Sequence, residues 1–126
     1  MGNEIQMSKY YEFRKAIRNL YDNDTKIGDL CCKILEIRDK YRYVESITTS
    51  IQEYNIDIEL ENGTDQDKKE KILTKVADAI GRYLVDNQTL LDPSIYNDPE
   101  FELFIESDNY IFCDIYVVGN SIKFTL

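Results

Sequence analysis

Hydrophobic and polar residues alternate along the C-terminal part of the chain, and this pattern predicts a three-stranded meander over residues 101–126. Apolar residues at every second position from Phe101 to Ile105 are typical of a half-buried strand. Ser107-Asp108-Asn109 supplies a turn, after which the alternation resumes from Tyr110 to Val118. Gly119-Asn120 then fits a two-residue hairpin, because both residue types tolerate positive φ.

The N-terminal part shows the three- and four-residue spacing of amphipathic helices. Tyr10, Phe13 and Ile17 recur at this spacing and predict a helix over about residues 3–20. A second helix begins near Asp24, after a short polar turn. Because the turn is short, the two helices are expected to form an antiparallel hairpin.

Residues 41–53 fit neither pattern cleanly. In a strand, only Tyr43, Ile47 and Ile51 would share a face, and they do not alternate regularly with polar residues. In a helix, the same residues satisfy the required spacing. We therefore predict that the second helix continues to about Gln52, although the threonines in between are poor helix formers.

The middle of the chain predicts one strand and a third helix. From Tyr54 to Glu61, apolar residues alternate with Asn, Asp and Glu, as in a strand with one buried face. A helix capped by Thr64 or Asp65 then extends to about Asp86. Residues 87–99 show no period and contain both prolines, so we predict a surface loop there.

Together these elements predict a single α+β domain over residues 1–126, in the order α-α-β-α-β-β-β. The four strands are expected to form one mostly antiparallel sheet, with the third helix packed on its aliphatic face. A chain of 126 residues with 43% hydrophobic residues can build one core, and a second domain is not expected.

Charge and composition narrow the classes of partner. The net charge is −9, and the acidic residues concentrate in the predicted strands and their loops, so direct binding to nucleic acid or to an anionic membrane is not expected. No apolar run approaches the ~18 residues of a membrane span, and the first residues lack a signal-peptide pattern. The three cysteines have no metal-type spacing and suit a reducing compartment. We expect a cytoplasmic protein of a bacterial cell or a phage-infected host, since the chain is rich in Ile, Asn, Lys, Asp and Tyr.

The chain contains no histidine, which excludes Ser-His-Asp and Cys-His catalysis. It also lacks a glycine-rich phosphate loop, and we expect no cofactor and no metal. Two of the carboxylates of Glu102, Glu106 and Asp114 could in principle serve as the acid and the base of glycoside hydrolysis. An open sheet face without a cleft does not favour that chemistry, so we expect no enzymatic activity.

The strongest candidate for function is the sheet face turned away from the helices. It is predicted to combine carboxylates with aromatic side chains, namely Glu102, Phe104, Glu106, Tyr110, Phe112, Asp114, Tyr116, Asp57, Glu59 and Glu61. Aromatic anchors inside an acidic rim suit a basic protein surface. The pattern therefore predicts a small acidic binding protein that inhibits a nuclease or another nucleic-acid-handling protein, of the toxin-immunity or phage anti-defence type.

A different interpretation is that the aromatic face is already covered, either by the helical hairpin or by a second copy of the chain. The protein would then be a phage or bacterial structural or assembly protein, or a secretion chaperone, that forms a homo-oligomer. Under this interpretation the aromatic residues contribute to stability and not to partner binding.

Overall fold

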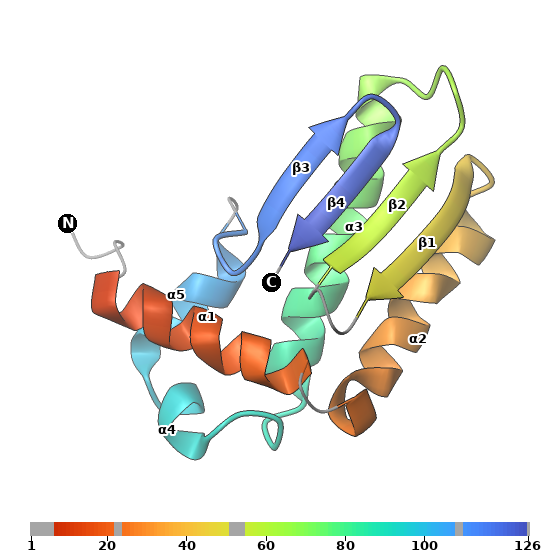
Figure 1. Ribbon diagram of the computed structural model, residues 1–126. Coiled ribbons are helices and arrows are strands. Elements are labelled where there is room, and N and C mark those ends of the chain that lie inside the picture. Colours follow the sequence, from red (N-terminus) through yellow and green to blue (C-terminus); the bar gives the residue numbers. More distant parts are fainter. Residues whose placement is uncertain (1–6, 22–23, 51–54, 108–109, 126) are drawn as a thin grey trace.

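The computed structural model describes residues 7–21, 24–50, 55–107 and 110–125. Its helices are α1 (Met7–Tyr21), α2 (Asp24–Lys40), α3 (Gln66–Asp86), α4 (Pro93–Tyr96) and α5 (Pro99–Glu106), and its strands are β1 (Val44–Ser50), β2 (Asn55–Leu60), β3 (Asp114–Val118) and β4 (Ser121–Thr125). The predicted α+β class is confirmed (Figure 1). Within the described residues, none of the helices is long and apolar enough to cross a membrane.

The four strands form one antiparallel sheet in the order β1-β2-β4-β3. The register places Ile58 of β2 opposite Ile47 of β1 and Ile122 of β4. All three side chains are buried, since this face packs on the helices. Figure 1 shows α2 and α3 behind the sheet, so the predicted packing of the third helix is confirmed.

The segment Val44–Ser50 is a strand, and our prediction of a helix there is wrong for residues 44–50. The register shifts between Val44 and Ser46, which leaves an extra residue in β1. This bulge places Val44 and Ile47 on the same buried face although they are three residues apart. Because of the bulge, the buried residues of β1 have the three-residue spacing that is typical of a helix. Residues 51–53 lie outside the described residues.

The segment Phe101–Glu106 is part of helix α5, and our prediction of a strand there is wrong. Asp98 caps the helix by accepting a hydrogen bond from the Glu100 amide at 3.0 Å, and Pro99 occupies its first turn. Phe101 and Phe104 are buried on one side of this helix. The short segment fits both patterns, because Phe101, Leu103 and Ile105 alternate as in a strand, whereas Phe101, Phe104 and Ile105 have helical spacing.

The predicted loop at residues 87–99 also contains a short helix, α4, so that prediction holds only in part. The predicted strand after residue 110 begins at Asp114, because residues 111–113 form a turn. The Gly119-Asn120 hairpin is confirmed, with Gly119 at a φ of 59°. Helix α3 is also confirmed, with Asp65 accepting a hydrogen bond from the Lys68 amide.

Helix α1 packs on α5 and also contacts α2, which follows it along the chain (Figure 1). The Phe13 ring of α1 lies 5.3 Å from the rings of both Phe101 and Phe104, measured between centroids. The Lys9 Nζ also lies 2.6 Å from Asp98, the residue that caps α5. Their hydrogen bond raises the pKa of Lys9 and lowers the pKa of Asp98. These contacts tie the first helix to α5.

Candidate protein-binding surface

The structure separates the aromatic residues that we expected on one sheet face. Phe104 lies on α5 and Phe112 in the turn before β3, and both are buried, with exposed fractions of 0% and 1%. Their assignment to an outer binding face is therefore wrong. Tyr110 lies in the same turn and packs against the Phe112 ring. Only Tyr116 stands on the expected face of the sheet, and 55% of its surface is exposed.

The predicted acidic residues also fall on different surfaces. Glu102 and Glu106 are exposed on α5 and do not belong to the sheet. Asp57 and Glu59 are on β2, on the side opposite its buried isoleucines, as expected. Glu61 follows the end of β2 and is exposed. Asp57, Glu59, Asp114 and Tyr116 are thus the predicted residues that the structure keeps together on one face.

We call the sheet surface turned away from α2 and α3 the open face. Cross-strand register assigns to it Ser46, Thr48, Asp57, Glu59, Ser121, Lys123, Tyr116 and Val118, with Asn55, Thr125 and Asp114 at the end nearest α1. Tyr116 and Val118 are its large apolar groups, and 75% of Val118 is exposed. Figure 1 shows no described helix in front of the two central strands. Our sequence analysis did not include Val118 among the site residues, although it continues the alternation that places Tyr116 on this face.

Polar pairs occupy the centre of the open face. The Lys123 Nζ lies 4.0 Å from the Asp57 carboxylate, and both side chains are more than one-third exposed. Such a pair contributes little to stability, since water screens it. The Ser121 hydroxyl donates a hydrogen bond to Glu59 at 2.7 Å. The face is therefore flat, polar at its centre and apolar toward β3, which suits contact with another protein surface.

Arg14 of α1 closes one end of the open face. Its guanidinium lies 3.2 Å from the Asp114 carboxylate and donates to the Tyr10 hydroxyl, also at 3.2 Å. Burial lowers the pKa of Arg14, but the hydrogen bond and the charge of Asp114 outweigh this effect and raise it. Asp114, which we predicted as a free acidic contact, is thus neutralised within the chain.

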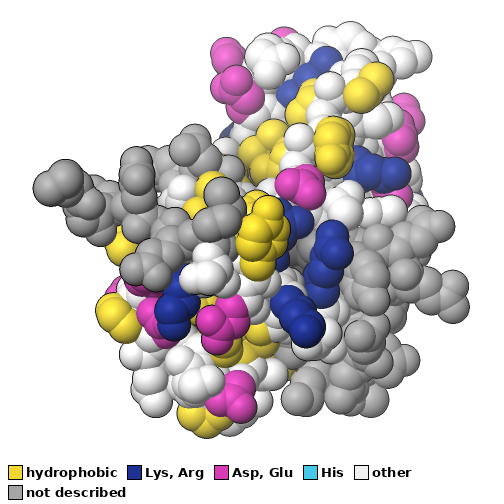
Figure 2. Space-filling view, turned by 60° about the vertical axis from the view of Figure 1, so that its left-hand side comes forward, with side chains coloured by type: hydrophobic (Ala, Val, Ile, Leu, Met, Phe, Trp, Pro, Cys, Tyr) yellow, Lys and Arg dark blue, Asp and Glu magenta, His cyan; other side chains and the backbone are white. Residues whose placement is uncertain are grey.

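Basic residues of α1 lie next to this ion pair. Arg14, Lys15 and Arg18 line a shallow hollow of about 520 Å³ together with Tyr10, Tyr11 and Asp114. Figure 2 brings this side of the molecule forward and shows Lys and Arg side chains near its centre, below exposed apolar side chains. The surface near Asp114 is therefore locally basic on a chain whose net charge is −9.

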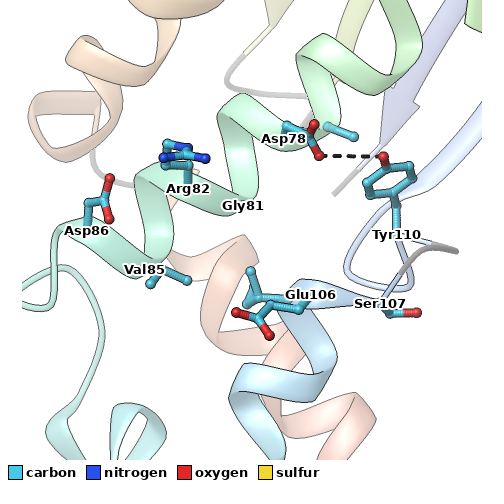
Figure 3. Close-up of a pocket in the computed structure, with 10 residues that line it drawn as sticks. Asp78, Gly81, Arg82, Val85, Asp86, Glu106, Ser107 and Tyr110 are labelled. Atoms are coloured by element: carbon cyan, nitrogen blue, oxygen red, sulfur yellow. Dashed lines mark hydrogen bonds between the residues drawn. The ribbon is translucent and has the colours of Figure 1, made fainter. Parts of the chain in front are cut away.

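A second hollow, of about 410 Å³, lies between α3 and the end of α5 (Figure 3). Gly81 allows these helices to approach closely, because a Cβ atom there would lie 3.3 Å from the Ile105 side chain. Tyr110 forms one wall at a positive φ of 48°, and its hydroxyl donates to Asp78 at 3.5 Å. Asp78, Asp86, Glu106 and Arg82 surround the floor. Two residues from the predicted site, Glu106 and Tyr110, therefore meet here and not on the sheet.

Neither surface has the ligand set of a metal centre: among the described residues, no three Asp, Glu or Cys side chains are grouped to hold an ion. No protein-family model, curated protein or solved structure matches the chain. A function for this chain must therefore be argued from its surface geometry and charge.

Proposed function

We propose that this chain is a non-catalytic binding protein that docks on a basic protein through the open face of its sheet. The observation that supports this proposal is the exposure of Tyr116 and Val118 on the same sheet face as Asp57 and Glu59. A tyrosine held on a strand offers a large contact area at a low cost in conformational entropy. Burying it together with Val118 would supply the apolar centre of an interface.

The charge of the whole molecule favours a basic partner. On the open face itself, Lys123 offsets Asp57, so Glu59 supplies most of the local negative charge. The chain as a whole carries a net charge of −9, although Arg14, Lys15 and Arg18 make the end of the face near α1 locally basic. A net charge of this size speeds the approach of a cationic protein, and salt weakens the attraction.

The proposed partner belongs to the nucleic-acid-handling proteins, whose ligand-binding surfaces are basic because they neutralise phosphates. An acidic protein that covers such a surface acts as an inhibitor, because it competes with the nucleic acid. We place the chain in the toxin-immunity or phage anti-defence class of inhibitors on this argument. The proposal attributes specificity to the open face and speed of association to the overall charge.

The test measures binding of the chain to a panel of purified cationic nucleases and DNA-binding proteins, by biolayer interferometry and by inhibition of nuclease activity. For the protein that binds, Tyr116→Ala should raise the dissociation rate about 30-fold, corresponding to about 2 kcal/mol. Glu59→Lys should slow association and reduce its dependence on salt. Leu35→Ala is the control, because Leu35 is 42% exposed on α2, which lies behind the sheet.

The proposal is wrong if binding of the identified protein survives both open-face changes, or if Leu35→Ala weakens it as much as Tyr116→Ala. It is also wrong if none of the cationic proteins in the panel binds. A structural or assembly role through a homo-oligomer remains the second candidate, and the exposed strand β3 favours it.

A further inference from the structure

Strand β3 forms one edge of the described sheet and exposes apolar side chains on both of its faces. Its neighbour in the sheet order is β4 alone. Tyr116, Val117 and Val118 are exposed by 55%, 44% and 75%, three consecutive residues of one strand. An exposed edge with apolar side chains is a template for pairing with another strand.

The two edges of the sheet differ in how they are protected. At the opposite edge, β1 carries the bulge between Val44 and Ser46 and an exposed Glu45, and both features oppose strand addition. The register of β3 with β4 runs without interruption from Asp114 to Val118. The single charge on β3 is Asp114, which Arg14 already neutralises. Strand β3 thus has neither the bulge nor the exposed, unneutralised charge that protects β1 from strand addition.

The sequence of β3 is suited to pairing with itself. We propose that two copies of the chain join their β3 strands in antiparallel fashion, across a twofold axis at Tyr116. This arrangement places Ile115 of each copy opposite Val117 of the other, so β-branched side chains pair across the interface. A two-residue turn joins Val118 to Ser121, so these two residues form a hydrogen-bonded pair. Hydrogen-bonded and non-hydrogen-bonded pairs alternate along an antiparallel ladder, so the backbone N–H and C=O groups of Ile115 and Val117 point away from β4. These groups can bond across the axis.

The charges near the two ends of β3 favour a second copy of the chain as the strand that pairs with this edge. Near Asp114, α1 contributes Arg14, Lys15 and Arg18. Near Val118, the Ser121 hydroxyl bonds to Glu59, and Glu61 adjoins the hairpin turn because the Leu60 amide donates to the Asn120 carbonyl. Antiparallel pairing sets the basic end of each copy beside the acidic end of the other. A strand that placed basic residues next to Asp114 at this edge would instead be repelled by α1.

The pairing would join two four-stranded sheets into a single sheet with a continuous open face. The side chains of Tyr116 and Val118 point to the faces and not to the edge, so they would stay accessible. The two Tyr116 rings would lie next to each other on the axis. This inference does not depend on the proposed function, because it concerns the chain alone.

The test is sedimentation velocity of the purified chain over a concentration series up to about 500 µM, the range in which weak homodimers form. We expect a reversible monomer–dimer equilibrium that weakens as NaCl is raised from about 50 to about 300 mM. Val117→Lys should weaken the dimer at least tenfold. Leu35→Lys is the matched control and should leave it unchanged, because Leu35 is 42% exposed on α2 and Val117 is 44% exposed on β3.

Three further variants separate strand pairing from simple hydrophobic contact. Val117→Pro should abolish the dimer, because proline removes an amide that faces the axis, while the monomer remains folded by circular dichroism. Lys15→Glu and Glu59→Lys should each weaken the homodimer, and mixing the two variants should restore association. A chain that stays monomeric throughout the series overturns the inference, and so does a dimer that survives both Val117 substitutions.

Discussion

Single residues show how the local backbone decides what an aromatic side chain does. Phe104, Phe112 and Tyr116 looked equivalent in the alternating pattern, yet two are buried and one is exposed. Phe104 points into the core because its segment is helical, and Phe112 because it precedes the strand in a turn. Tyr116 keeps the expected outer position, since β3 does form there. Side-chain type alone does not separate these outcomes.

Cys113 gives a prediction at this scale. It is 6% exposed, and burial raises the pKa of its thiol to about 12. In the unfolded chain, a cysteine thiol ionises at a pKa of about 8.5, so only the unfolded state loses this proton between pH 8 and 11. The free energy of unfolding should therefore fall as the pH rises above about 9.

Urea unfolding at pH 7 and pH 10 measures this effect. Between these values, the loss of stability should be up to about 2 kcal/mol smaller in Cys113→Ala than in the parent chain. In the folded protein at pH 8, a thiol reagent should label the exposed Cys32 and leave Cys113 unlabelled. Rapid labelling of Cys113 in folded protein would contradict the burial on which the prediction rests.

At the scale of elements, short segments carried too little pattern to distinguish a helix from a strand. Helix α5 has eight residues, and its buried residues, Phe101, Phe104 and Ile105, satisfy helical spacing. The signal that could have identified it is Asp98-Pro99, a cap followed by a residue that favours the first helical turn. Strand β1 was missed for the opposite reason, because its bulge changed the spacing of buried residues.

The helical assignment of α5 can be tested with a pair of neighbouring residues. Phe104 is fully buried and Leu103 is 41% exposed, as expected for adjacent positions on a helix at the surface. Phe104→Ala should cost about 3–5 kcal/mol of unfolding free energy, because it leaves a cavity among aromatic rings. Leu103→Ala should cost less than about 1 kcal/mol. Equal costs measured by chemical denaturation would show that α5 does not bury the side that we describe.

At the scale of the whole molecule, the helices divide between two places. Helices α2 and α3 cover one face of the sheet, whereas α1 and α5 share an aromatic contact at its end (Figure 1). This division leaves the other sheet face open, which is the basis of the proposed docking surface. Had α1 packed across the open face, Tyr116 would have been covered.

A pair of aromatic substitutions tests this layering. Phe124 on β4 is fully buried against the helices, and Tyr116 on β3 is more than half exposed on the open face. Phe124→Ala should lower the free energy of unfolding by about 3–5 kcal/mol, and Tyr116→Ala by less than about 1 kcal/mol. Melting curves in dilute solution measure both. A large loss for Tyr116→Ala in a monomer would remove the open face from the proposal.

The sequence by itself determined the elements whose pattern is long or strongly marked. Helix α3 has 21 residues with a clear apolar stripe, β2 alternates without a break, and the Gly119-Asn120 hairpin follows from turn chemistry. The α+β class followed from these elements. The helix and the hairpin depend on interactions between residues near in sequence, and the alternation in β2 reports which of its side chains are buried. Each of them therefore leaves a periodic or local pattern in the sequence.

Tertiary structure decided the rest. The bulge in β1 exists because β1 pairs with β2, and helix α5 is stabilised by contact with Phe13, which lies about ninety positions away. The candidate site changed for the same reason: pairing set Tyr116 beside Lys123, and α1 brought Arg14 to Asp114. Contacts between distant residues carry no local period, so the chain reveals them only once it is folded.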